Sequence, residues 1–181
     1  MSIDKNTQRM LSASQAERGT TILETMVALV ILLVGVLAII GLLSIAVTQN
    51  WNQGDRSTRT TEYAQDKMEQ LLALNFNDGA SNTAVYPTAS TGGTGLGGTM
   101  SGNSTVGGVT SGSPVAQYVD YIDASGNLQT SSTGALYIRQ WSISTNSTAN
   151  VKTITVVVRA MISTSSGSVW PTTTLVSMKS Q

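Results

Sequence analysis

The layout of this chain follows from residues 17–47, which read ERGTTILETMVALVILLVGVLAIIGLLSIAV. A carboxylate at Glu24 stands just before an uninterrupted apolar run from Met26 to Val47. At about 1.5 Å per residue, a helix over this run would cross the hydrocarbon core of a bilayer, which is about 30 Å thick. An ionisable side chain beside such a segment is costly, which makes Glu24 a candidate functional residue. We therefore predict a transmembrane segment over residues 26–47, with Glu24 at its start.

The composition limits the classes of function that this chain can have. Its 181 residues suit one domain plus a membrane anchor. The formal net charge is zero and the ten cationic residues are scattered, so we expect no nucleic acid as a partner. Cysteine and histidine are both absent, which removes disulfides, the common zinc sites and histidine-based acid–base chemistry. We therefore expect no catalytic residue, no cofactor and no metal site, and predict that the protein is not an enzyme.

The residues around Gly19 resemble the N-terminus of a type IV prepilin, which carries a class III signal peptide. In that family a short polar leader ends in Gly, a prepilin peptidase cuts after this Gly and methylates the new amine, and Glu is the fifth mature residue. The resemblance implies a leader over residues 1–19, cleavage between Gly19 and Thr20, N-methylation of Thr20, and subunit assembly through Glu24. The chain has Thr20 where the family usually has Phe.

Two other interpretations of the same segment stay open. In a secretory signal peptide, Ser44-Ile45-Ala46 would supply the small-x-small cleavage pattern, and the mature chain would begin at Val47. Such a signal usually has an apolar region of about 7–15 residues, which the run here greatly exceeds. The other alternative is a single-pass anchor without processing. Arg18 lies closer to the apolar run than Arg56 does, which mildly favours an N-inside orientation.

Gly35 and Gly41 interrupt the apolar run. Each lowers helix propensity by about 1 kcal/mol relative to alanine. In the prepilin family a helix breaker about twenty residues after the cut often lets the helix loosen on assembly, and the resemblance gives Gly41 this place. The alternative is that small residues let helices pack closely in lipid. Both interpretations stay open.

A long helix is predicted over residues 20–76. The segment from Thr48 to Phe76 contains no proline and only Gly54, and Asn77-Asp78-Gly79 is typical of a helix stop. Helical spacing places an apolar stripe on one face, with the neighbouring polar residues turned mostly outward. The stripe comprises Ala64, Met68, Leu71, Leu72 and Asn75, and the outward residues are Gln65, Asp66, Glu69 and Gln70. Residues 63–71 resemble the Ala-x-Asp-x-Met-Glu-x-Leu stretch of V-type minor pilins and I-type pseudopilins.

Residues 77–117 are rich in Gly, Ser and Thr and are predicted to form a long loop that buries little. Gly93, Gly95 and Gly98 match G-x-G-x-x-G, but the expected strand and helix do not flank them, so we interpret the match as chance. Residues 118–181 are predicted to form a sheet, with strands at 118–122, 135–144, 151–162 and 169–178.

Within this sheet, alternation places two sets of side chains together, each on one face of its strand. These sets are Tyr137, Arg139, Trp141 and Ile143, and Ile154, Val156, Val158, Ala160 and Ile162. Trp141 is expected to be a core residue or to pack on the helix. Asp120 and Asp123 do not fit the spacing of an EF-hand loop and are interpreted as a solvated turn.

The fold class implied is α+β: a pilin fold, with a long N-terminal helix packed on an antiparallel sheet of roughly four strands. The resemblance implies a structural subunit, a minor pilin, of a type IV pilus. Its partners would be other pilin subunits, the prepilin peptidase, the assembly machinery of the inner membrane and, before assembly, the lipid bilayer. The chain would lie in the inner membrane with its C-terminal domain extracytoplasmic, and then in the extracellular pilus. The alternatives are a pseudopilin of a type II secretion system and a membrane-anchored adhesin or binding module.

Overall fold

The computed structural model describes residues 21–110, 112–161 and 170–181. The predicted leader, with Gly19, and the adjoining Thr20 lie outside these ranges, as do Ile162 and Val169 of the predicted strands. The chain divides into two compact units, Met1–Asn50 and Trp51–Gln181.

The first unit is described from Thr21 and consists of the first part of helix α2 (Ile22–Ala73). The predicted membrane segment, residues 26–47, is helical throughout, and every residue from Thr21 to Asn50 is exposed. The hydroxyls of Thr25 and Thr48 donate to the carbonyls of Ile22 and Ser44 at 2.8 and 2.9 Å. Polar side chains at both ends of the apolar run are therefore satisfied within the helix itself.

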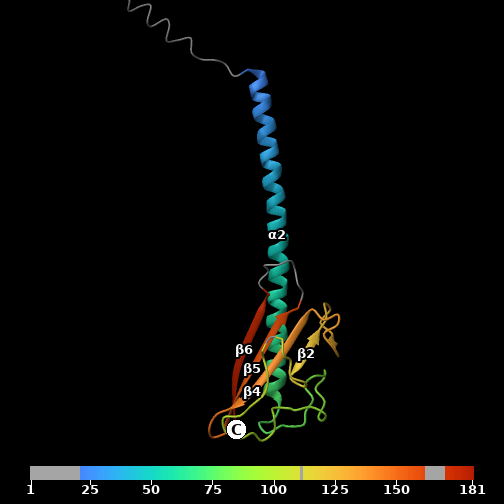
Figure 1. Ribbon diagram of the computed structural model, residues 1–181, viewed down its shortest axis with the longest axis vertical. Coiled ribbons are helices and arrows are strands. Elements are labelled where there is room, and N and C mark those ends of the chain that lie inside the picture. The colour runs from blue at the N-terminus through green and yellow to red at the C-terminus, as the bar shows by residue number, and fades with distance from the viewer. Residues whose placement is uncertain (1–20, 111, 162–169) are drawn as a thin grey trace, which may run out of the picture. The chain divides into compact units, whose positions relative to one another are not determined.

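The second unit combines the last part of α2 with an antiparallel six-stranded sheet, and its long strands β4, β5 and β6 lie side by side along the helix (Figure 1). The strand order is β3-β2-β4-β5-β6, and β1 pairs with β4. The strands are β1 (Thr105–Gly107), β2 (Val119–Ile122), β3 (Leu128–Gln129), β4 (Tyr137–Thr145), β5 (Val151–Ala160) and β6 (Thr172–Ser180).

The four predicted strands correspond to β2, β4, β5 and β6, but the sheet has two strands more than expected. Strand β1 lies inside the predicted loop 77–117, where Thr105–Gly107 pairs with residues 142–144 of β4. Strand β3 has two residues and pairs with the end of β2. Both are too short to display an alternating pattern, so their neighbours define them rather than their own sequence.

The core lies between α2 and one face of β4 and β5. In the register of these strands, Trp141 faces Val156 and Arg139 faces Val158. Trp141 is fully buried, which confirms its predicted place in the core. The two sets predicted to share a face do so as far as they are described, both are buried, and Ala64, Met68 and Leu71 of α2 pack in the same core.

The predicted loop buries more than its composition suggests, so that expectation is wrong. Leu96 is fully buried and joins the core cluster. A Cβ atom at Gly93 or Gly95 would overlap the Asn82 backbone or Asp78, respectively. Glycine is needed at these two positions because the chain folds closely back on itself. The described residues after Gly98 form no helix, which agrees with the interpretation of the glycine pattern as a chance match.

Helix α2 ends at Ala73, three residues before the predicted end at residue 76. The carbonyl of Leu72 accepts a hydrogen bond from Lys179 Nζ at 2.5 Å, and the carbonyl of Leu74 accepts another from the same atom. The Phe76 carbonyl accepts one from Lys152 Nζ at 2.6 Å. Lysines of β6 and β5 thus bind the carbonyls at the helix end, which have no partner within the helix.

Candidate functional site

Glu24 lies in the first turn of α2 and is exposed. Thr21 precedes the helix, and its Oγ1 atom lies 3.4 Å from the backbone nitrogen of Glu24. The pattern Thr21-x-x-Glu24 is that of a capping box, and a carboxylate in the first turn interacts favourably with the helix dipole. The one capping-box hydrogen bond present comes from the Glu24 backbone, so its carboxylate interacts with the helix start only through the dipole. The predicted cleavage and methylation positions, Gly19 and Thr20, lie outside the described residues.

The apolar anchor, Ile22–Val47, presents its large side chains outward all around the helix. Their exposed fractions range from 45% at Val36 to 81% at Ile22. Monomeric soluble proteins rarely expose a contiguous apolar patch larger than a few hundred Å². By length and composition this helix could cross a membrane. Among the described residues nothing covers the anchor.

Gly35 and Gly41 lie within this unbroken helix. A Cβ atom at either position would meet nothing within 4 Å. Neither glycine is needed for packing among the described residues, which leaves both the loosening role and close approach of another helix as predictions.

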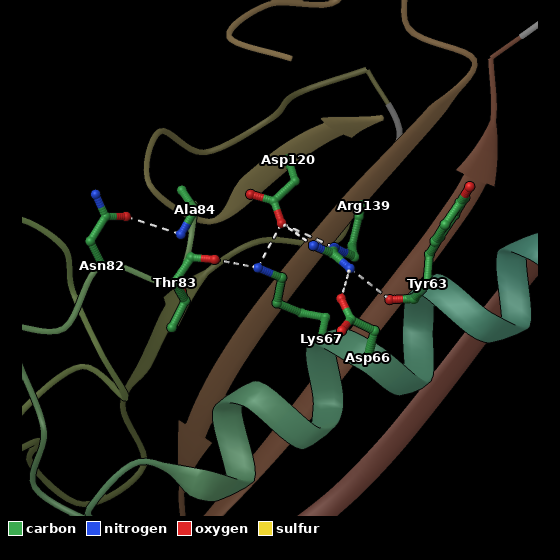
Figure 2. A network of polar contacts seen from close by, with 8 residues as sticks. All are labelled: Tyr63, Asp66, Lys67, Asn82, Thr83, Ala84, Asp120 and Arg139. Atoms are coloured by element: carbon green, nitrogen blue, oxygen red, sulfur yellow. Dashed lines mark hydrogen bonds and ion pairs between the residues drawn. The ribbon is translucent and has the colours of Figure 1, made fainter. Parts of the chain in front are cut away.

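In the second unit, four charged side chains form what we call the ion cluster (Figure 2). Asp66 and Lys67 come from α2, Asp120 from β2 and Arg139 from β4. Asp120 Oδ2 accepts hydrogen bonds from Lys67 Nζ at 2.6 Å, from Arg139 Nη2 at 2.7 Å and from Arg139 Nε at 3.0 Å. Arg139 Nη1 donates to Asp66 Oδ2 and to the Tyr63 carbonyl, both at 2.9 Å. One carboxylate oxygen thus joins the helix to two strands.

Three of the four side chains in the ion cluster are almost fully removed from water. The side chain of Lys67 is 0% exposed and those of Asp120 and Arg139 are 2% exposed, whereas Asp66 is 49% exposed. Lys67 Nζ also donates to the Thr83 carbonyl at 2.5 Å and lies 4.5 Å from the centre of the Trp141 ring. Removing one partner of a buried ion pair typically costs about 3–5 kcal/mol, because the other charge stays buried without compensation. The ion cluster therefore locks α2 to the sheet in one register.

Burial first and the nearby Arg139 guanidinium second lower the pKa of Lys67 from its ordinary value of 10.5 to about 8. The carboxylate of Asp120 acts in the opposite direction but does not offset the loss of water. Lys67 is thus charged at neutral pH and loses its proton in mildly alkaline solution.

The sequence interpretation missed this cluster. Asp120 was expected in a solvated turn, and that expectation is wrong because the residue is 4% exposed and paired. Asp123 does lie at a turn, where its carboxylate accepts backbone hydrogen bonds from Ser125 and Asn127. A signal for the cluster was present: alternation places Arg139 on the same face as Trp141, which was expected in the core, and a buried arginine requires a carboxylate.

A cleft of about 950 Å³ opens beside the ion cluster, and we call it the hairpin cleft. Its walls are α2, residues 84–86 and the β2–β3 hairpin, and Asp66, Asp120 and Arg139 also line it. Tyr86, at its rim, is 76% exposed. The volume lies within the range of about 300–1,000 Å³ that is typical of ligand sites. Sequence reasoning gave no indication of this cleft, because its walls come from segments far apart in the chain.

Comparison of the chain with models of known protein families, with curated proteins and with solved structures found no match.

Proposed function

We propose that this protein is a structural subunit of an extracellular filament, a minor pilin of a type IV pilus. Prepilin peptidase would cut after Gly19, and the chain would wait in the inner membrane until the assembly machinery moves it into the filament. The single observation that supports this proposal most strongly is the fully exposed apolar anchor, with the carboxylate of Glu24 in its first turn. An apolar helix of this kind suits both the bilayer and a filament core, because lipid tails and packed apolar helices are similarly apolar.

In a filament core Glu24 would be removed from water and would need a cationic partner. The new α-amino group of Thr20 on an adjacent subunit is the best candidate. That amine exists only after cleavage, so processing would control assembly. The uncut precursor carries an amide at this position and has no charge to offer.

Glu24 variants separate this role from the capping of its own helix. Glu24→Gln keeps the side-chain hydrogen-bonding capacity that a capping box uses but removes the charge, whereas Glu24→Ala removes both. We expect both variants to insert into the membrane normally and to be lost from sheared filaments, as measured by immunoblotting. Wild-type incorporation of Glu24→Gln alongside loss of Glu24→Ala would assign Glu24 to capping and overturn the ion-pair role.

The processing step is tested by mass spectrometry of the protein purified from its native envelope. We expect a mature chain that begins at methylated Thr20, and we expect Gly19→Val to accumulate as the uncut precursor. A mature chain that begins at Met1 would indicate an unprocessed anchor. A chain that begins at Val47 would indicate a secretory signal peptide. Either result would overturn the proposal.

A pseudopilin of a type II secretion system would share the leader, the anchor and the sheet. Electron microscopy of shed fibres with antibody against this chain distinguishes the two, because a pilus subunit labels fibres on the cell surface. A membrane-anchored adhesin or binding module would instead keep its anchor in the membrane fraction and be absent from fibres.

A further inference from the structure

Several hydrogen-bond acceptors line the hairpin cleft. On the helix side, Glu62, Asp66 and Gln70 line the cleft at a spacing of four residues. This spacing places them on one face of α2 over about 12 Å. The Gln70 Oε1 atom is buried, and no hydrogen bond reaches it from the described residues. Glu62 and Asp66 are like charges at positions i and i+4, and Arg139 pairs with Asp66 but not with Glu62.

The hairpin side of the cleft also presents hydrogen-bond acceptors. Asn127 and Gln129 line it, but their amide nitrogens donate to the Asp123 carboxylate at 3.1 and 2.9 Å. Their side-chain carbonyl oxygens accept no hydrogen bond from the described residues and are open to a ligand. Opposite them, Arg139 donates through Nε, Nη1 and Nη2 to Asp120, Asp66 and the Tyr63 carbonyl. All three guanidinium nitrogens thus donate hydrogen bonds within the protein.

The negative formal charge of the cleft favours a cationic ligand. The lining contains three carboxylates, Glu62, Asp66 and Asp120, against one guanidinium, so its formal charge is −3 + 1 = −2. Lys67 and Arg139 offset Asp66 and Asp120, so the charge that remains in the cleft is −1 and belongs to Glu62. Within the described ranges, no group of three metal-ligating side chains is arranged to hold a metal ion. Tyr86 at the rim adds an exposed ring face, and such faces attract ammonium and guanidinium groups.

We propose that the hairpin cleft binds an organic cation, an ammonium or guanidinium group on an aliphatic stem. Two sources carry this chemistry: a lysine- or arginine-bearing segment of another polypeptide, and a free polyamine. Donor-rich cations satisfy the acceptors of both walls, and their stems fit beside Tyr86 and Leu128. The inference uses only the second unit and does not rest on the proposed filament role.

The test is isothermal titration calorimetry on the full chain in a neutral detergent, at constant ionic strength. The probes are a tri-lysine peptide amide, spermidine and, as a neutral donor-rich control, maltotriose. We expect saturable binding of at least one cation and none of maltotriose. Binding of the peptide alone, of spermidine alone or of both supports the site and identifies the source.

Glu62→Gln is the diagnostic variant, because Glu62 is exposed and no hydrogen bond or ion pair within the described residues depends on it. Glu69→Gln is its matched control, since Glu69 is exposed on the same helix but does not line the cleft. Glu62→Gln should weaken cation binding by about two- to fivefold, as expected for one partly screened charge pair, and Glu69→Gln should leave it unchanged. Absence of saturable binding for both cations, equal weakening by the two variants, or binding of maltotriose alone would overturn the proposal.

Discussion

The two ends of α2 lie in opposite environments although both are regular helix. Between Ile22 and Val47 every side chain is exposed, whereas Ala64, Lys67 and Leu71 are fully buried against the sheet. The buried end includes a lysine, which the sheet accommodates through Asp120. The exposed end includes Glu24, for which the described residues supply no cationic partner. Helicity therefore depends on the local sequence, whereas the environment of each end depends on what packs against it.

The buried end should be the more sensitive to loss of a charge. Asp120→Ala leaves Lys67 and Arg139 without their shared carboxylate, and we expect it to lower the free energy of unfolding by about 3–5 kcal/mol. The measurement is urea denaturation of the full chain in detergent, followed by tryptophan fluorescence. The matched change is Asp66→Ala, which removes the half-exposed carboxylate of the same cluster and should cost less than about 1 kcal/mol. Similar losses for both variants would contradict the assigned burial.

The exposed end should be sensitive to gain of a charge. Leu33→Arg places a cation in the middle of the apolar anchor and should oppose membrane insertion by about 2.5–3.5 kcal/mol. Membrane fractionation should show less protein in the bilayer, while the urea midpoint of the second unit stays unchanged. Leu33→Ile is the control and should behave as the wild type. A wild-type membrane fraction for Leu33→Arg would mean that the anchor does not enter the hydrocarbon core.

The smallest expected effect is the pH dependence that Lys67 contributes. Its pKa is about 8 in the folded protein and 10.5 ordinarily, so between these values the unfolded chain holds a proton that the folded chain has released. By linkage, the free energy of unfolding must rise with pH across this window, because the cost of burying the charged ammonium is removed. Lys67→Met should lack this rise. Urea denaturation of both proteins at pH 7.5 and 9.5 measures it, and a constant difference between them would refute the lowered pKa.

Much of the fold could be predicted because its signals are periodic and local. The apolar run from Met26 to Val47 identified the first part of α2, and alternation identified β4 and β5 with the side chains that share one face of each. The stripe containing Ala64, Met68 and Leu71 identified the face of α2 that packs on the sheet. Such patterns are repeated over many residues, so a single irregular position does not obscure them.

The hairpin cleft and the ion cluster could not be predicted in this way. Asp120 lies 53 positions after Lys67 in the chain, and no local sequence pattern around either residue predicts their contact. The burial of Leu96 was likewise missed, because glycine-rich sequence is typical of flexible loops unless another segment packs on it.

Local chemistry in the sequence was sufficient to establish an apolar helix long enough to cross a bilayer, a carboxylate at its first turn and a C-terminal region of alternating strands. Pairing between distant segments established the rest. It formed the ion cluster of Lys67, Asp120 and Arg139, the added strands β1 and β3, and the end of α2 at Ala73, where Lys179 binds the carbonyls of Leu72 and Leu74. The physical reason is that helix and strand periods are properties of neighbouring residues, whereas the desolvation of a charge or a carbonyl depends on which remote side chain replaces water.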